Sequence, residues 1–221
     1  MFIYGGAASP FMQRVLIAAR AKGRELECRA VPGGGMQSDE FRDISPMGRV
    51  PVLALDDGRH VSESSAIATY LDEALSGPSL LPTDLIDRAR MREIEAVATL
   101  EYATGMRPIM VARLFGRPTP EPIVEAAYAQ AGKGAEVLDR ILGETAGRYA
   151  VGDVITLADC ILAPVLTLAL LADPVAGTAG FVKGHRGLAE YMQRVSNDAV
   201  IGRSLAEMRE ASARMMAARG E

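Results

Sequence analysis

The chain has 221 residues, of which 49% are hydrophobic and 24% are charged, and its formal net charge is −4. This length accommodates one large domain or two small ones with a buried core, and the charge gives no reason to expect a nucleic-acid partner. The apolar stretch 160–172 is shorter than a bilayer requires and contains Pro164, so we expect no membrane span.

The cysteine and histidine content limits the chemistry further. Cys28 and Cys160 lie in apolar surroundings without C-x-x-C spacing, which favours a reducing compartment. His60 and His185 are the only histidines, too few for a zinc site. Residues 1–4 are strand-like and lack the pattern of a signal peptide. We therefore expect a cytoplasmic protein without a metal.

Strand and helix patterns alternate over the first part of the chain, residues 1–75. Strands are predicted at 2–4, 26–31, 51–55 and 59–61, and helices at 11–22 and 63–75. Gly23 ends the first helix, and residues 56–58, Asp-Asp-Gly, form a hairpin turn. The order β-α-β-loop-β-β-α predicts an α/β domain, a compact sheet with helices packed on it.

The second part of the chain is helical. Residues 76–83, rich in glycine and proline, are predicted to be a linker, and residues 84–221 an all-helical domain. Helices are predicted at 85–115, 120–142, 156–171, 187–195 and 204–218. Pro108 is expected to kink or end the first of these.

A capping box begins the best-defined of these helices. Thr156 stands at the N-cap, and Asp159 follows three positions later, where its carboxylate can return a hydrogen bond to the cap amide. The predicted role is structural, because the box fixes how the chain enters the helix.

Ser9 stands where the first strand passes into the first helix. Pro10 suits the first helical position, so Ser9 falls at the N-cap, where its hydroxyl accepts a bond from a backbone amide. A second interpretation is that the positive end of this helix holds an anion and that Ser9 donates its hydroxyl proton to it.

Pro51 begins a strand that should lie inside the sheet. Proline is poorly tolerated there, so the Val50–Pro51 bond is a candidate for cis geometry, which would turn the Val50 backbone outward to pair with a peptide-like ligand. An ordinary trans proline at a strand start is the alternative.

Glu63 and Ser64 begin the next predicted helix. Capping is the default role of such residues. The helix start also suits a carboxylate, while Glu63 can pair with an ammonium group. A site offering both would fit the head group of an amino acid.

Together these stretches resemble the glutathione-binding half of a cytosolic glutathione transferase. The resemblance is carried by Ser9-Pro10-Phe11 with Arg14-Val15, by residues 46–53 (Pro-Met-Gly-Arg-Val-Pro-Val-Leu), and by Glu63-Ser64 before Ala66-Ile67. Residues 149–159 are similar to the family's second-domain capping motif. The family implies a thioredoxin-like domain, an all-helical domain and a homodimer.

The resemblance also implies roles for the site residues. Ser9 would stabilise the thiolate of glutathione, which is a co-substrate. Six further residues would bind the tripeptide, with Val50 and Pro51 at its cysteinyl part, Glu63 and Ser64 at its γ-glutamyl end, and Arg49 and Gln37 near its glycyl carboxylate. Arg49 is equally an exposed charge, and Tyr4 is a rival to Ser9, because other classes use a tyrosine near the end of the first strand.

Within the family the chain resembles the serine type, nearest to the zeta and tau classes. Residues 33–41 resemble zeta, whereas Ser9-Pro10-Phe11 is tau-like. Zeta isomerases of maleylacetoacetate carry serine and cysteine where this chain has Pro10 and Phe11. Ser45 replaces the usual asparagine of an Asn-Pro pair, a turn residue of similar local bonding.

The second substrate is expected between the domains, where clefts usually form. The candidate lining residues are Phe11, Tyr102, Met106, Arg107 and Met110. Core packing or dimer contacts are the alternative for the methionines.

These features predict a glutathione transferase that activates the thiol for attack on a small hydrophobic electrophile. The Ser9 hydroxyl and the helix dipole would favour the thiolate of a group whose free pKa is about 8.5. The alternatives are a glutathione-dependent isomerase or reductive dehalogenase, and a non-catalytic glutathione-binding or interaction protein.

Overall fold

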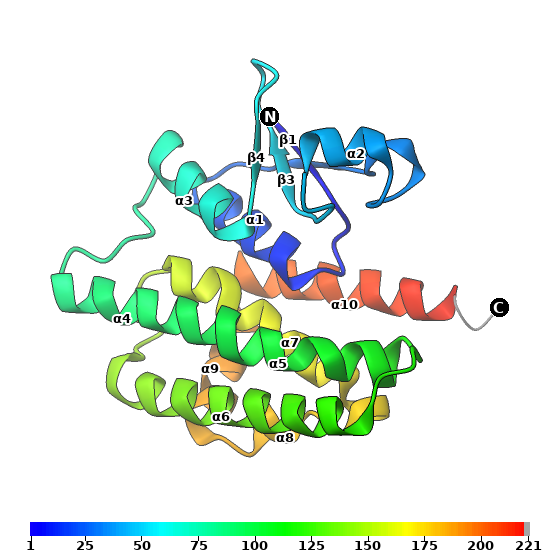
Figure 1. Cartoon of the computed structure of the whole chain (residues 1–221). Helices are drawn as coiled ribbons and strands as arrows, with labels where there is room; N and C mark the ends of the chain where they lie inside the picture. Colours follow the sequence, from blue (N-terminus) through cyan, green and yellow to red (C-terminus); the bar gives the residue numbers. More distant parts are fainter. Residues whose placement is uncertain (219–221) are drawn as a thin grey trace. The chain divides into compact units, whose positions relative to one another are not determined.

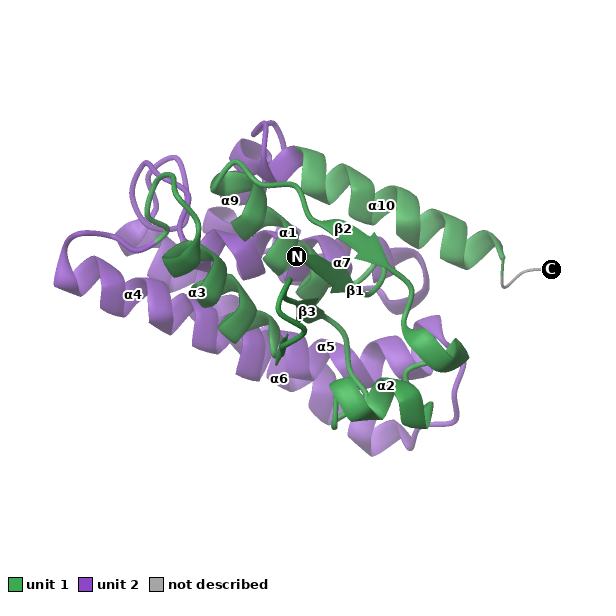
Figure 2. Ribbon diagram, turned by 90° about the horizontal axis from the view of Figure 1, so that it is seen from above, with its two compact units in different colours: residues 1–80, 203–221 green, residues 81–202 purple. Residues whose placement is uncertain are grey.

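The computed structural model describes residues 1–218 and divides into two compact units (Figures 1 and 2). Unit 1 comprises residues 1–80 and the C-terminal segment from residue 203, and unit 2 comprises residues 81–202. The last helix is therefore grouped with the sheet, coloured green in Figure 2, although it follows the helical half of the sequence.

Unit 1 is built on a four-stranded sheet of order β2-β1-β3-β4. The strands are β1 (Phe2–Tyr4), β2 (Glu27–Arg29), β3 (Val52–Ala54) and β4 (His60–Ser62). β1 pairs in parallel with β2 and antiparallel with β3, and β3 pairs antiparallel with β4. The helices are α1 (Pro10–Ala21), η1 (Pro32–Gly34), α2 (Asp39–Ile44), α3 (Ser64–Ala74) and α10 (Ile201–Ala217), the last of which lies in unit 1 from residue 203. The thioredoxin-like domain is confirmed.

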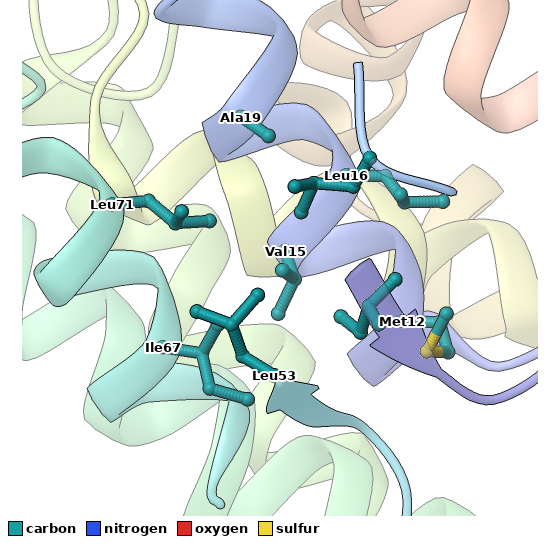
Figure 3. Packing of buried hydrophobic residues seen from close by; sticks show 9 residues of the cluster. Met12, Val15, Leu16, Ala19, Leu53, Ile67 and Leu71 are labelled. Carbon is teal, nitrogen blue, oxygen red and sulfur yellow. The ribbon is translucent and has the colours of Figure 1, made fainter. Parts of the chain in front are cut away.

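The core of unit 1 forms where α1 and α3 pack on the sheet. Figure 3 shows Val15 of α1 directed toward Leu53 of β3 and Ile67 of α3, and all three are fully buried. Val15 follows Met12 by three positions, the spacing that places side chains on one helix face. Burial of each such large side chain stabilises the fold by about 1.5–3 kcal/mol.

Helices η1 and α2 occupy the segment that the sequence leaves as a loop. Ser38 caps α2, because its hydroxyl oxygen accepts from the Phe41 amide at 3.2 Å. Phe41 is fully buried and anchors the helix. A helix of 6 residues is too short to show a helical period in the sequence.

The regular elements of unit 2 are all helices, which confirms the predicted helical character of the second part of the chain. They are α4 (Leu85–Ala96), η2 (Val97–Ala103), α5 (Thr104–Ile109), η3 (Met110–Leu114), α6 (Glu121–Thr145), α7 (Leu157–Ala176), α8 (Gly180–Lys183) and α9 (Arg186–Val195).

The helical run from Leu85 continues through Pro108 to Leu114. The wider π-helical turns of η2 and η3 lie on either side of α5, which contains the proline. Such turns accommodate an irregularity in the hydrogen-bond ladder. The proline therefore interrupts the regular α-helix without ending the helical run.

Close helix packing explains why glycine is tolerated inside α6. A Cβ on Gly134 would lie 3.0 Å from the Tyr102 backbone nitrogen, and one on Gly105 would lie 2.6 Å from that of Ala131. Both contacts are tighter than side chains accept, so the glycines allow η2 and α5 to approach α6 closely.

Helix α7 begins with the predicted capping box. The Thr156 side chain accepts from the Asp159 amide, and the Asp159 side chain accepts from the Thr156 amide. These reciprocal bonds confirm the prediction. By length and composition alone α7 could cross a membrane, but 67% of its most apolar window is buried inside the structure. It is the core helix of unit 2.

Candidate active site

Three chain segments leave the sheet of unit 1 at the same end. Tyr4 at the end of β1 pairs with Val52 at the start of β3, and Val52 pairs with Ser62 at the end of β4. Because neighbouring strands lie about 4.8 Å apart, these three residues form one row across the sheet. Three segments therefore adjoin the same edge of the sheet: the loop that carries Ser9, the residues before β3, and the start of α3.

Ser9 occupies the N-cap of α1. Its hydroxyl oxygen accepts from the Met12 amide at 3.4 Å, a long bond, and Pro10 takes the first helical position. Within residues 1–218 no protein group accepts the Ser9 hydroxyl proton. The oxygen thus caps the helix while the proton remains available to an anion at the positive helix end.

Val50 lies beside the start of the β1–α1 loop. A Cβ on Gly5 would approach the Val50 Cβ to 3.1 Å and the Met12 Sδ to 2.5 Å, so only glycine fits there. The Val50–Pro51 peptide bond is cis, the first of the two geometries that the sequence left open. Neither the Val50 N–H nor its carbonyl is paired with another group of the described chain, residues 1–218.

Glu63 and Ser64 begin α3. Glu63 holds φ 69° and ψ 116°, a region that residues with side chains rarely adopt, and its side chain does not cap the helix. Ser64 is buried at the first helical position. The exposed Glu63 carboxylate and the free amides of the first turn of α3 can hold an ammonium and a carboxylate respectively.

The predicted glycyl-end residues are both exposed. The Gln37 Oε1 accepts from Arg42 Nη2 at 2.6 Å. The Arg49 backbone is held by Ser45, whose hydroxyl donates to the Arg49 carbonyl at 2.9 Å and accepts from the Arg49 amide at 3.1 Å. Ser45 therefore performs the local bonding expected of an asparagine at this turn.

An open pocket of about 460 Å³ adjoins Val50. It is lined by Gly5, Gly6, Cys28, Arg29, Ala30, Val31, Met36 and Val50. The residues from β2 and the following loop are absent from the sequence prediction, because scattered apolar positions carry no motif. Partial burial raises the pKa of the Cys28 thiol, which disfavours its thiolate form.

The residues predicted to line the second-substrate site fall in both units. Phe11 is half-buried in the first turn of α1, in unit 1. In unit 2, Tyr102 and Met106 are fully buried, Met110 is 6% exposed and Arg107 is exposed. Burial raises the pKa of the Tyr102 phenol, whose hydroxyl has no partner within residues 1–218.

Two further groups bear on the predicted chemistry. The Tyr4 ring packs against Phe2, Phe41 and His60, with the nearest ring centroids 5.0 Å apart. Across residues 1–218 no cluster of three or more histidine, cysteine or acidic side chains is arranged to hold a metal ion.

Two family models match the sequence. "Glutathione S-transferase, N-terminal domain" matches residues 8–74, and "Glutathione S-transferase, C-terminal domain" matches residues 121–194. The first range contains Ser9, Val50 and Glu63, and the second contains the capping box of α7.

Curated relatives and solved structures extend these matches. Maleylacetoacetate isomerase of Rattus norvegicus is 36% identical over 169 residues, 73% of this chain and 74% of the relative. Glutathione S-transferase Z2 of Arabidopsis thaliana is 31% identical over 204 residues, 87% and 89% of the two chains. The crystal structure of maleylacetoacetate isomerase from Methylobacterium extorquens AM1 with bound malonate and GSH shares the fold, with a TM-score of 0.76, 24% identity and coverage of 95% and 97%.

Proposed function

Because the chain belongs to the glutathione S-transferase family, we propose that unit 1 binds glutathione and activates its thiol for attack on a small hydrophobic electrophile. The row Tyr4–Val52–Ser62 carries this proposal, because it aligns the loop of Ser9, the Val50 backbone and the start of α3 along one sheet edge.

The dimensions of this edge suit a tripeptide. From β1 across β3 to β4 the row spans two strand spacings, about 10 Å, and three extended residues also span about 10 Å. An extended ligand antiparallel to Val50 would place its central residue beside the backbone N–H and carbonyl of Val50. One end would then reach Glu63 and Ser64, and the other Gln37 and Arg49.

The thiol chemistry follows from Ser9. A hydrogen bond donated to a thiolate, together with the positive end of α1, stabilises the anion and lowers the pKa of the thiol. Each unit by which the pKa falls corresponds to about 1.4 kcal/mol. Ser9 itself does not attack the substrate.

The reaction balances without a further reagent. The thiolate sulfur donates an electron pair to the electrophilic carbon, and a C–S bond forms. In a substitution the leaving group departs with the electron pair of its bond. In an addition to a conjugated alkene, the pair of the double bond passes to the carbon next to the carbonyl, which then takes a proton from water.

The test compares wild type with Ser9→Ala, using ultraviolet thiolate absorbance of bound glutathione and thioether formation with an aryl halide. We expect the pKa of the bound thiol to rise toward about 8.5 and the rate at neutral pH to fall at least about tenfold, the effect of losing one bond to a charged group. Asp84→Ala is the matched control, because it removes the N-cap of α4 in unit 2. An unchanged pKa and rate in Ser9→Ala would exclude Ser9 from the chemistry.

A glutathione-dependent isomerase is the second candidate, favoured by the 36% identity to the rat maleylacetoacetate isomerase. Addition of the thiolate to a conjugated cis-alkene gives an enolate; if rotation about the new single bond and expulsion of the thiolate precede proton uptake, the electron pair reforms the double bond as the trans-alkene and glutathione is returned. Mass spectrometry separates the two functions, since only conjugation leaves glutathione attached. Tight glutathione binding with no thiolate absorbance would favour a non-catalytic role.

We also propose a cytoplasmic homodimer, as the family implies. Large apolar side chains stand exposed at the start of α4, where Leu85 is 77% and Ile86 is 67% exposed, and such surface favours association. Sedimentation equilibrium measures the oligomeric state directly, and a monomer at micromolar concentration would contradict this part of the proposal.

A further inference from the structure

Gln13 is fully buried in α1, one turn after Ser9. Its side-chain Nε2 donates to the Ala7 carbonyl at 2.7 Å, inside the β1–α1 loop. Its backbone N–H donates to the Ser9 carbonyl at 3.1 Å, and the Ser9 N–H donates to the Gly6 carbonyl at 3.2 Å. Gln13 thus binds two carbonyls of this segment, that of Ala7 within the loop and that of Ser9 at its end.

The other half of the Gln13 amide has no partner. Its Oε1 atom is buried without a hydrogen bond from any residue in the range 1–218. The orientation of the amide is fixed nevertheless, because the Ala7 carbonyl can only accept and therefore requires the nitrogen. A buried acceptor left unpaired is unfavourable, and an apolar side chain of similar size would avoid that penalty.

Stability therefore does not explain this glutamine. Native proteins keep few buried polar groups unpaired, and those that persist call for a functional explanation. What Gln13 alone supplies is a donor to the Ala7 carbonyl, two residues before Ser9. That donor adds a side-chain restraint at Ala7 to a loop whose ends are held by backbone bonds, from the Gly5 N–H to the Arg29 carbonyl and from the Ser9 N–H to the Gly6 carbonyl.

We infer that Gln13 is a positioning residue that holds the β1–α1 loop so that the Ser9 hydroxyl points at the glutathione sulfur. The inference rests on the proposed function. Gln13 acts through Ser9 and touches neither substrate. Its loss should affect the ionisation of the thiol more than the binding of the tripeptide, because Val50, Glu63 and Ser64 lie outside the loop.

Gln13→Met is the informative variant, since it keeps the length and removes the donor. We expect the pKa of the bound glutathione thiol to rise and kcat at neutral pH to fall about three- to tenfold, with KM for glutathione within about twofold of wild type. The melting temperature should change little, because removal of the unpaired Oε1 offsets the loss of the hydrogen bond to the Ala7 carbonyl. A merely structural role predicts the reverse, a lower melting temperature with an unchanged thiol pKa.

Gln13→Asn provides a second variant in case the methionine disturbs folding. Its amide is one methylene too short to reach Ala7, and the same rise in thiol pKa is expected. Ile17→Val is the matched control, because it trims another fully buried residue of α1 away from the loop. It should lower the melting temperature and leave the thiol pKa unchanged.

A double-mutant cycle decides whether Gln13 acts through Ser9. In the Ser9→Ala background, Gln13→Met should not move the thiol pKa further. An additional shift of the same size would overturn the inference, as would a normal thiol pKa in both Gln13 variants. If Ser9→Ala alone leaves the thiol pKa unchanged, it is the proposed function that fails, so the two failures are distinguishable.

Discussion

Glu63 is the one non-glycine residue with a positive φ among residues 1–218. Such a conformation costs about 1–3 kcal/mol and persists only where the surroundings enforce it. Here β4 ends at Ser62 and α3 begins at Ser64, so the whole turn from strand to helix falls on one residue. Its carbonyl is already committed to the helix, because it accepts from the Ile67 amide at 2.9 Å. The strain keeps a carboxylate where glycine would be more stable.

Glu63→Gly should therefore separate stability from function. Glycine adopts this backbone freely, so we expect the free energy of unfolding to rise by about 1 kcal/mol. Glutathione affinity should fall, because the carboxylate proposed to pair with its ammonium group is lost. Urea denaturation and calorimetric titration with glutathione measure the two effects.

Glu63→Gln is the control that isolates the charge. It keeps the strained backbone, so its stability should match wild type while its glutathione affinity falls. If Glu63→Gly lowers stability, the backbone at this position is not strained. If glutathione affinity is unchanged in both variants, Glu63 has no part in binding.

The predictability of single residues differs with the kind of information each one needs. Spacing alone predicts Ser9 and Asp159 as capping residues, because a cap depends on neighbours within four positions. The strain at Glu63 follows from how two elements meet. The unpaired Gln13 amide depends on a three-dimensional contact, so neither feature has a sequence signature.

At the scale of the element, the α7 capping box is larger than its sequence motif suggests. Asp159 Oδ2 accepts from the Thr156 amide and hydroxyl at 2.8 and 2.9 Å. Its Oδ1 accepts from the Ala150 amide at 2.8 Å and the Tyr191 hydroxyl at 3.0 Å. Burial raises the pKa of Asp159, and these four bonds act in the opposite direction. The carboxylate thus joins α7 to the preceding loop and to α9.

Asp159→Ala should destabilise the protein by about 3–5 kcal/mol, since it leaves several buried donors unpaired. Thr156→Ala removes the cap but keeps the Asp159 bonds to Ala150 and Tyr191, so we expect a loss of only about 1–2 kcal/mol. Chemical denaturation of the two variants measures the difference. Equal losses would mean that the carboxylate acts as a local cap only.

Helices were predicted correctly where the periodic segment was long, and they were missed where the element was short or irregular. The 12 residues of α1 and the 20 of α7 show clear patterns, whereas α2 has 6 residues and α8 has 4. The π-helical turns on either side of α5 also went unpredicted, because the proline predicts an interruption but not the form that it takes.

At the scale of the whole molecule, the chain returns at its end to the unit where it began. Arg20 of α1 donates to both carboxylate oxygens of Glu207 in α10, at 2.7 and 3.0 Å, and to the Ser204 hydroxyl at 2.7 Å. Ser204 and Glu207 follow Arg20 by 184 and 187 residues in the sequence, so no local pattern connects them to it. The helical pattern of the sequence therefore predicts α10 as part of the helical domain, because it follows the other helices in order.

An ion-pair cluster joins α10 to the rest of unit 1 and consists of Arg20, Glu25, Arg203 and Glu207. Its two arginines should contribute unequally to stability. The Arg20 side chain is 9% exposed and its Nη2 donates to both carboxylate oxygens of Glu207, whereas the Arg203 side chain is 55% exposed. Removing the Arg20 side chain loses its hydrogen bonds to Glu207 and Ser204 together with the packing of its buried stem, while exposed pairs contribute about 0–1 kcal/mol. We expect Arg20→Ala to destabilise the protein by about 2–3 kcal/mol and Arg203→Ala by less than about 1 kcal/mol.

Hydrogen exchange along α10 locates the effect. In Arg20→Ala the amides of α10 should exchange faster, while those of α6 in unit 2 stay protected, because the lost contacts all lie within unit 1. Raising the salt concentration should weaken the exposed Arg203 pairs and leave the Arg20 pair almost unaffected, since ions screen buried charges poorly. Equal effects of the two substitutions would instead mean that apolar packing holds α10. In that case the fully buried Met208 would be its anchor, and Met208→Ala would release the helix where Arg20→Ala does not.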